Sequence, residues 1–285
     1  MKNKNLDLLT IKELVELFLG EEQRTINALK EEKSNIVKVV NKIKEKIQKG
    51  GIVIYIGSGT SGRLGVLDAA ECKPTFSTDL FQGVIAGGKG AILQAKEGAE
   101  DNTKQAVRDL KKFKITKNDV IVGVSASGET PYTVSAIKHA KKIRSLTIGI
   151  TSNPKSTLSR IAHYRISPQT RDEIISGSTR LKSGTAQKII LNMISSITMI
   201  KSGKVYGDLM IDVKPTNKKL VSRAIGIIST VCKLSLNRAK SLFYKARKNT
   251  KVAIVMHFKK CNLERARKLL AKADFNLRKI IGNPN

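Results

Sequence analysis

The chain is poor in aromatic residues, because Trp is absent and aromatic side chains make up only 4% of the 285 residues. A core built from this composition has to be mostly aliphatic, and few rings are left on which nucleic-acid bases could stack. No zinc-finger, RNA-recognition or K-homology signature is present. Nucleic acid is therefore not the expected partner, although the net charge is +30.

Cysteine and histidine are scarce and scattered. The cysteines are Cys72, Cys232 and Cys261. Their spacing fits neither a zinc site nor a thioredoxin-like pair, and it favours a reducing compartment. The histidines are His139, His163 and His257, with no spacing typical of a metal site or a catalytic triad. We therefore expect no metal site.

Long hydrophobic runs are absent as well. No segment approaches the length of a membrane span, and Asp7, Glu13 and Glu16 interrupt the first apolar residues. These acidic residues argue against a signal peptide. We expect a soluble cytoplasmic protein with no membrane partner.

One stretch has the pattern of a buried strand, a glycine loop and a helix. The β-branched run Ile52–Ile56 precedes Gly57-Ser-Gly-Thr-Ser-Gly62, and Leu64, Leu67 and Ala70 follow at helical spacing until Pro74. Such a turn points free backbone N–H groups and a helix N-terminus at an anion. It therefore predicts a site for a phosphate or a similar anion.

A second loop repeats this design, since the apolar run Val120–Val124 is followed by Ser125-Ala-Ser-Gly-Glu-Thr-Pro131. Two hydroxyl-rich loops at the carboxyl edge of one sheet could share a phosphorylated ligand. The first loop also matches the glycine pattern of dinucleotide-binding proteins. In those proteins an acidic residue stands at the end of the second strand, whereas Asp79 precedes the second expected strand here. The plain alternative is that both loops are tight turns only.

The chain in order predicts an α/β fold with a parallel sheet between helices and a small all-helical C-terminal module. We expect a helical segment in residues 1–50, the α/β domain with both hydroxyl-rich loops in 51–206 and the helical module in 217–285. The expected strands are 52–56, 81–86, 120–124, 146–150 and 164–166. The expected helices after the first loop are 91–101, 131–144, 185–201, 224–231, 238–246, 252–258, 263–271 and 275–281.

Two carboxylates stand out beside small neighbours, Glu71 after Ala69-Ala70 and Glu100 after Gly98-Ala99. A pair of carboxylates can act as general base and general acid where their environments separate their pKa values. On these residues alone a solvated helix end is the better interpretation. Asp68, Glu97 and Asp101 are neighbouring competitors, and Arg180, Lys182 and Lys188 could meet an anion near the start of a helix.

Several long segments resemble the N-acetylmuramic acid 6-phosphate etherase family, over nearly the whole chain and more weakly before Gly50 and after Asn217. They are Gly57–Cys72, Ile85–Gly88, Glu97–Asp101, Ala126–Tyr132, Gly177–Lys188 and Gly203–Met210. The resemblance implies the sugar isomerase (SIS) fold, a homodimer and a C-terminal module similar to ubiquitin-associated domains. It implies no metal and no organic cofactor.

The resemblance also implies a reaction and its residues. The family cleaves the lactyl ether of N-acetylmuramic acid 6-phosphate by elimination and then hydration. Its catalytic glutamates match Glu100, as the base at C2, and Glu71, as the acid and then the base for water. The expected phosphate-binding residues are Thr60, Ser61, Ser127, Gly128, Thr130 and Lys182.

Some positions depart from the family pattern. Glu129 stands where the family commonly has Arg, so its carboxylate must point away from the proposed phosphate loop or weaken binding. Lys73 replaces a usual Pro and Ser58 a usual Ala, and neither touches the proposed chemistry. The segment from Asn217 onward carries 18 Lys and Arg against two acidic residues, which leaves an acidic partner or nucleic acid possible beside a merely solvated surface.

Three alternatives to the etherase stay open. A non-catalytic sugar-phosphate sensor is one, because the glucokinase regulatory protein resembles the same family; it would be longer, with a second SIS domain, and the presence of both glutamates favours catalysis. A sugar-phosphate isomerase of the SIS fold is the second, although it leaves the etherase-like segments unexplained. A nucleic-acid-binding module is the third and most distant.

Overall fold

The computed structural model describes residues 5–282. The chain divides into two compact units, one of residues 5–70 and 80–195 and one of residues 71–79 and 196–282. Each unit has a hydrophobic core of its own, and both cores are mostly aliphatic. That composition follows from the shortage of aromatic residues.

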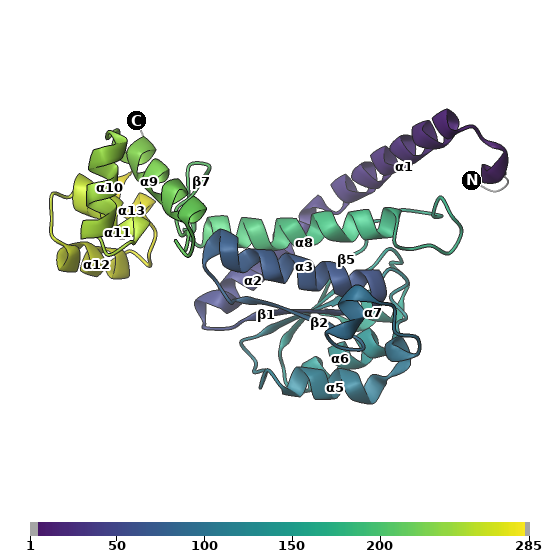
Figure 1. Ribbon diagram of the computed structural model, residues 1–285. Helices are drawn as coiled ribbons and strands as arrows, with labels where there is room; N and C mark the ends of the chain where they lie inside the picture. Colours follow the sequence, from purple (N-terminus) through teal and green to yellow (C-terminus); the bar gives the residue numbers. More distant parts are fainter. Residues whose placement is uncertain (1–4, 283–285) are drawn as a thin grey trace. The chain divides into compact units, whose positions relative to one another are not determined.

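The first unit is built on a five-stranded sheet in the order β2-β1-β3-β4-β5, and every pair is parallel (Figure 1). The strands are β1 (Val53–Gly57), β2 (Phe81–Ile85), β3 (Val120–Val124), β4 (Leu146–Ile150) and β5 (Tyr164–Ile166). All five predicted strands are confirmed, with bounds that differ by at most one residue. Runs of β-branched residues, buried along their whole length in β1 and β3, gave a clear signal.

Helices cover both faces of this sheet, which confirms the predicted α/β class (Figure 1). Ile54 and Ile56 of β1 share a core cluster with Tyr132 and Ala136 of α6. On the opposite face, a Cβ at Gly65 of α3 would lie 2.9 Å from Cβ of Tyr55. The helices as far as residue 201 are η1 (Leu6–Leu8), α1 (Ile11–Glu31), α2 (Lys33–Gln48), α3 (Gly59–Phe76), α4 (Gly90–Leu93), η2 (Ala99–Asp101), α5 (Thr103–Lys111), α6 (Pro131–Lys142), α7 (Thr157–Ile161) and α8 (Lys182–Lys201).

The two N-terminal helices differ in how much of their length is buried. α2 buries Ile36, Val39, Val40 and Ile43 and packs beside β5. α1 starts at a capping box in which the Thr10 hydroxyl accepts from Glu13 N–H and the Glu13 carboxylate accepts from Thr10 N–H. Its buried residues all lie in its second half, at Glu21, Thr25 and Leu29.

Two sequence predictions about helix ends are wrong. The single helix expected over residues 91–101 is instead α4 and η2, because Gly98 between them takes a left-handed φ of 69°. The helix after the first loop does not stop at Pro74 but continues to Phe76. Pro74 removes one N–H in the last turn of α3, and the burial of Phe76 beyond it outweighs that loss.

Helix α5 and the short α7 have no counterpart among the predicted elements. Each starts at a side-chain cap, since Asn102 accepts from Gln105 N–H and Ser156 accepts from Ser159 N–H. α5 packs beside α6 and buries Ala106 and Leu110. Six of its nine residues are charged or polar, so its short apolar face gives little signal in the sequence.

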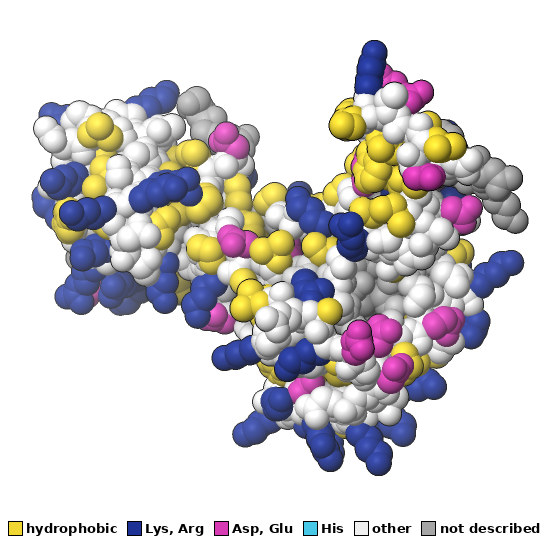
Figure 2. Space-filling model, turned by 45° about the vertical axis from the view of Figure 1, so that its right-hand side comes forward, with side chains coloured by type: hydrophobic (Ala, Val, Ile, Leu, Met, Phe, Trp, Pro, Cys, Tyr) yellow, Lys and Arg dark blue, Asp and Glu magenta, His cyan; other side chains and the backbone are white. Residues whose placement is uncertain are grey.

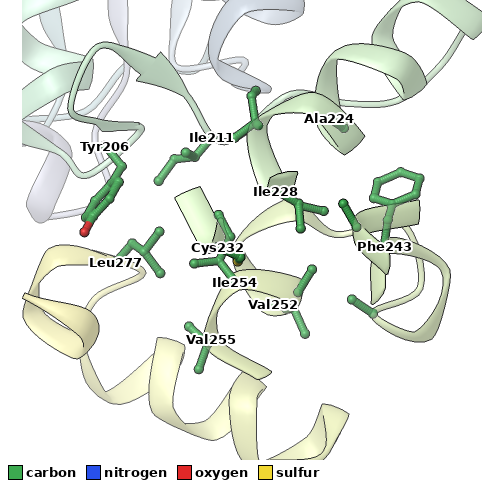
Figure 3. Packing of buried hydrophobic residues seen from close by; sticks show 14 of the residues in the cluster. Tyr206, Ile211, Ala224, Ile228, Cys232, Phe243, Val252, Ile254, Val255 and Leu277 are labelled. Carbon is green, nitrogen blue, oxygen red and sulfur yellow. The ribbon is translucent and has the colours of Figure 1, made fainter. Parts of the chain in front are cut away.

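The second unit consists of helices with one small hairpin. The hairpin is β6 (Val205–Tyr206) with β7 (Leu209–Met210), and the helices are α9 (Lys218–Cys232), α10 (Leu236–Lys245), α11 (Thr250–Phe258), α12 (Leu263–Lys272) and α13 (Arg278–Ile281). Asparagine side chains cap α9, α11 and α12, at Asn217, Asn249 and Asn262. The core between these helices contains Phe243, Ile254 and Ile228 (Figure 3).

No single helix within residues 5–282 is long and apolar enough to cross a membrane. The pair α9 and α10 reaches the required length and composition together, with a bend of 109° at the break between them.

Phe243 is expected to be a main stabilising residue of the second unit, because its ring is fully buried. Phe243→Ala should lower the free energy of unfolding by about 3–5 kcal/mol through lost burial and the cavity left behind. The measurement is hydrogen exchange of the α9 and α11 amides, which reports on this unit alone. Tyr244→Ala is the matched control, since this neighbouring ring is half exposed and its loss should cost little. Equal effects of the two changes would contradict the assigned core.

Candidate functional site

The first glycine loop is held by close backbone contacts. A Cβ at Gly57, the last residue of β1, would lie 2.7 Å from the Val124 carbonyl oxygen, and one at Gly62 would lie 2.7 Å from the Gly57 carbonyl oxygen. No other residue fits these two positions without moving backbone. The 18-residue helix α3 starts at Gly59, so its N-terminal N–H groups and dipole face an anion at this loop. Thr60 and Ser61 are half-buried there.

The second loop is tied together by its own hydroxyls. Ser125 Oγ accepts from Gly128 N–H at 3.0 Å and lies 2.8 Å from Thr130 Oγ1, while Ser127 Oγ accepts from Glu129 N–H at 3.2 Å. Gly128 has a φ of +71°, and its Cβ would lie 2.1 Å from Ser156 Oγ. Helix α6 then starts at Pro131, whose missing N–H costs nothing at that position. Ser127, Gly128 and Thr130 therefore form one compact turn at a helix N-terminus.

Glu129 does not place its charge in this turn. Its Oε1 accepts from Thr157 N–H at 2.8 Å, at the first residue of α7. That hydrogen bond holds the pKa of the exposed Glu129 carboxyl below its ordinary value. The acidic residue that departs from the family pattern thus serves as a cap for α7.

The start of α8 lies beside the first loop. A Cβ at Gly184 would be 3.5 Å from Thr60 Cγ2, which is ordinary contact distance. Ser152, at the end of β4, donates to Ser183 Oγ at 3.1 Å, and its N–H donates to the Ala126 carbonyl in the second loop. The structure therefore brings three features to one edge of the sheet, namely the two loops and the N-terminus of α8.

A carboxylate already occupies the N-terminus of α8. Glu173 accepts from the N–H groups of Lys182 and Ser183, at 2.9 Å each. Glu173 is not among the predicted site residues, because it precedes the helix by nine residues and no local cap pattern marks it. An anionic ligand at this edge meets a negative charge there as well as the two glycine loops.

The Lys182 ammonium has partners inside the protein. Its Nζ lies 2.8 Å from Glu21 Oε2 and 2.9 Å from the Asp172 carbonyl oxygen, and the whole side chain is 1% exposed. Glu21 also pairs with Arg24. These contacts join α1 to the start of α8. Because the ammonium is held by groups of the protein itself, a contact of Lys182 with a ligand stays a prediction.

The two candidate catalytic glutamates are both exposed in the single chain. Glu71 lies on α3 and belongs to the second unit, whereas Glu100 lies in η2 of the first unit. Glu100 is held near the end of β2, because Lys96 Nζ donates to the Gly87 carbonyl at 3.1 Å and Gly98 turns the chain back. The pairing of the two glutamates across one substrate stays a prediction.

Asp68 differs from both glutamates because it is buried. Its Oδ1 accepts from Asn192 Nδ2 at 2.6 Å and from Ser195 Oγ at 3.1 Å, and burial raises the pKa of its carboxyl. Asp68 therefore fastens α3 to α8 three residues before Glu71. It is a structural anchor in this arrangement.

The histidines show no arrangement for metal binding or for a triad. His163 Nδ1 lies 2.7 Å from Thr147 Oγ1, and burial lowers the pKa of its ring. Over residues 5–282 no group of three or more His, Cys, Asp or Glu side chains could hold a metal ion.

The five-stranded parallel sheet and the helices on both of its faces define the SIS fold. A family model described as the SIS domain matches residues 102–196, and one described as the glucokinase regulatory protein N-terminal SIS domain matches residues 35–141. A phosphoheptose isomerase from Francisella tularensis has a similar fold, with a TM-score of 0.53 over 70% of this chain and 100% of that chain at 16% identity.

Longer and closer matches identify the particular family. The chain is 47% identical over 270 residues to the N-acetylmuramic acid 6-phosphate etherase of Clostridium beijerinckii, covering 94% of this chain and 89% of the relative. It is 45% identical to the etherase of Staphylococcus saprophyticus over 98% of this chain and 95% of the relative. The chain belongs to the N-acetylmuramic acid 6-phosphate etherase family.

Gly128→Ala is expected to destabilise the first unit by about 2–3 kcal/mol, because the left-handed φ is strained for alanine and the new methyl collides with Ser156. Gly50→Ala is the control: Gly50 has a φ of +81° but nothing within 4 Å of an added Cβ, so it should lose only about 1 kcal/mol. Urea denaturation followed by hydrogen exchange in β3 compares them. A loss no larger than that of Gly50→Ala would refute the tight packing at Gly128.

Proposed function

We propose that this protein cleaves the D-lactyl ether of N-acetylmuramic acid 6-phosphate and releases N-acetylglucosamine 6-phosphate and D-lactate. As a member of the etherase family it is a carbon–oxygen lyase. The observation that carries the proposal is identity of 47% over 94% of the chain with an N-acetylmuramic acid 6-phosphate etherase. The glycine loops, at the carboxyl edge of a parallel sheet, supply a place for the phosphate.

In the proposed mechanism the phosphate anchors the open-chain sugar at the two loops. The turn of Ser127, Gly128 and Thr130 lies at the start of α6, and Thr60 and Ser61 lie at the start of α3. Hydroxyls and N–H groups at helix N-termini suit the oxygens of a phosphate monoester. Anchoring fixes C2 and C3 of the sugar at a constant distance from the loops, which orients the reacting atoms.

The chemical steps fall to the two glutamates. Opening of the ring gives an aldehyde, which acidifies the proton on C2. Glu100 takes this proton, the C2–C3 double bond forms, and the C3–O bond to lactate breaks as Glu71 donates a proton to the departing oxygen. Glu71, now ionised, takes a proton from a water molecule while the oxygen of that water adds to C3. The proton held by Glu100 returns to C2. Such roles need environments that keep one carboxyl ionised and the other protonated.

We also propose that the enzyme is a cytoplasmic homodimer. The cysteines at positions 72, 232 and 261 are all free, which suits a reducing compartment. The exposure of both glutamates in the single chain leaves room for a second subunit to enclose the substrate.

A second candidate function is sugar-phosphate sensing without catalysis. It is favoured by the match of residues 35–141 to the glucokinase regulatory protein N-terminal SIS domain. Glu71 and Glu100 would then have no chemical task. The presence of both carboxylates is the reason to prefer the etherase.

Glu100→Gln and Glu71→Gln are each expected to lower kcat for D-lactate release by about 10²–10⁴-fold, because a general base or acid is lost at nearly unchanged size. The assay measures D-lactate from N-acetylmuramic acid 6-phosphate. Glu97→Gln, another exposed carboxylate of the same segment, is the control and should keep full activity. Saturable binding of the substrate without lactate release by the native protein would leave the sensor instead.

Exchange of the C2 proton with deuterium oxide separates the two roles. Glu71→Gln should keep this exchange, since Glu100 is intact, and Glu100→Gln should abolish it. Exchange that survives in Glu100→Gln and vanishes in Glu71→Gln would reverse the assignment.

Ser127→Ala and Thr130→Ala are expected to raise KM by about 10-fold or more, because each removes a hydrogen bond to a charged phosphate oxygen, worth about 1.5–3 kcal/mol. Steady-state kinetics of lactate release measures the change. Ser34→Ala, at an exposed position on α2, is the control. An unchanged KM in both loop variants would place the phosphate elsewhere.

A further inference from the structure

The first half of α1 exposes an apolar face that its own chain does not cover. Ile11, Val15 and Leu19 lie four residues apart, so they share one side of the helix, and they are 82%, 53% and 68% exposed. Leu8, just before the helix, is 75% exposed. Figure 2 shows this patch of hydrophobic side chains on α1. A helical segment of about ten residues is marginal in water without tertiary contacts, so this face calls for a cover.

The same segment is acidic in a strongly basic protein. Residues 5–20 carry Asp7, Glu13 and Glu16 against the single cation Lys12. The chain as a whole has 53 Lys and Arg against 23 Asp and Glu. The surface that covers this helix face is therefore expected to be apolar at its centre and basic at its margin.

The second unit carries a groove with that character. The groove, of about 670 Å³, lies between the first half of α9 and the length of α10. Its lining within residues 215–248 has no acidic side chain. Its apolar lining includes Val221, Ile225 and Leu236, and its margin carries Lys218, Lys240 and Lys248. Leu236 is 63% exposed and Tyr244 is 49% exposed. Lys and Arg gather on the visible face of this unit (Figure 2).

We propose that the groove at α9 and α10 of one copy binds the exposed face of α1 from a second copy. Ile11, Val15 and Leu19 would enter the apolar lining, while Glu16 meets the lysines at the margin. Nine helical residues span about 13 Å, and the part of α10 that lines the groove, from Leu236 to Tyr244, is of the same length. In a two-fold dimer the exchange is reciprocal, so both helices and both grooves are covered. The pairing adds a specific contact to the proposed homodimer.

Cysteine cross-linking between two differently marked copies tests the pairing. One copy carries Leu19→Cys and the other carries Leu236→Cys, both in a Cys261→Ser background that removes the only half-exposed native thiol among residues 5–282. The two are co-expressed and oxidised mildly. The expected result is a covalent heterodimer, at least ten times more abundant than when Lys268→Cys, on an exposed face of α12, replaces Leu236→Cys.

A charge exchange makes the test specific. Lys240→Glu with Lys248→Glu in the groove copy should reduce the heterodimer at least fivefold, and Glu16→Lys in the α1 copy should restore it. Apart from Cys261, which packs against the core of the second unit, all altered positions are outside both cores. Circular dichroism checks that the variants fold.

Two results would overturn the pairing. They are a heterodimer no more abundant than in the Lys268→Cys control, and a dominant Leu19→Cys to Leu19→Cys dimer. Sedimentation of the native protein is measured in parallel. A dimer without the α1 cross-link leaves the proposed homodimer standing while the pairing fails.

Discussion

The close approach of two backbone segments at the end of β1 is the constraint on which the candidate site depends. Gly57 lies against the Val124 carbonyl and against the turn at Gly62, with no room for a side chain at either glycine. This packing sets the first loop beside the end of β3, where the second loop starts. The start of α8 reaches the same edge through Gly184 and Thr60. The proposed phosphate site at the starts of α3 and α6 therefore depends on the absence of Cβ atoms at these positions.

Features that depend on neighbouring residues could be predicted from the sequence, whereas contacts between residues far apart in the sequence could not. The apolar runs of β1 and β3 are local, and their strands were predicted nearly to the residue. The helix expected at 91–101 is wrong because Gly98 takes a left-handed conformation, and Ile92 and Leu93 are exposed rather than packed as a helix face. Lys182 looked like an anion ligand beside a helix start, yet its partner Glu21 lies 161 residues away and no local pattern marks it. The catalytic roles proposed for Glu71 and Glu100 come from the family resemblance, because their neighbouring residues alone do not indicate a catalytic role.

Charge has different consequences in different parts of the chain. In the first unit single carboxylates make structural contacts. Glu173 accepts from the first N–H groups of α8, Asp68 accepts from Asn192 and so joins α3 to α8, and Glu21 pairs with Lys182. From Asn217 onward nearly every charge is positive, and at the exposed start of α1 most charges are negative. A protein with this distribution discriminates strongly between partners by sign, and association through such surfaces weakens as ionic strength rises.

The hydrogen bond from Thr157 N–H to Glu129 links the sequence of the second loop to the folding of a neighbouring helix. An arginine at position 129 would bring a cation to the loop, but it would also leave the first turn of α7 without its carboxylate. The residue at position 129 therefore affects both the charge beside the second loop and the hydrogen bonding at the start of α7. The cap at Ser156, which accepts from Ser159 N–H, does not involve residue 129, so an arginine there would remove one of two side-chain acceptors at the start of α7.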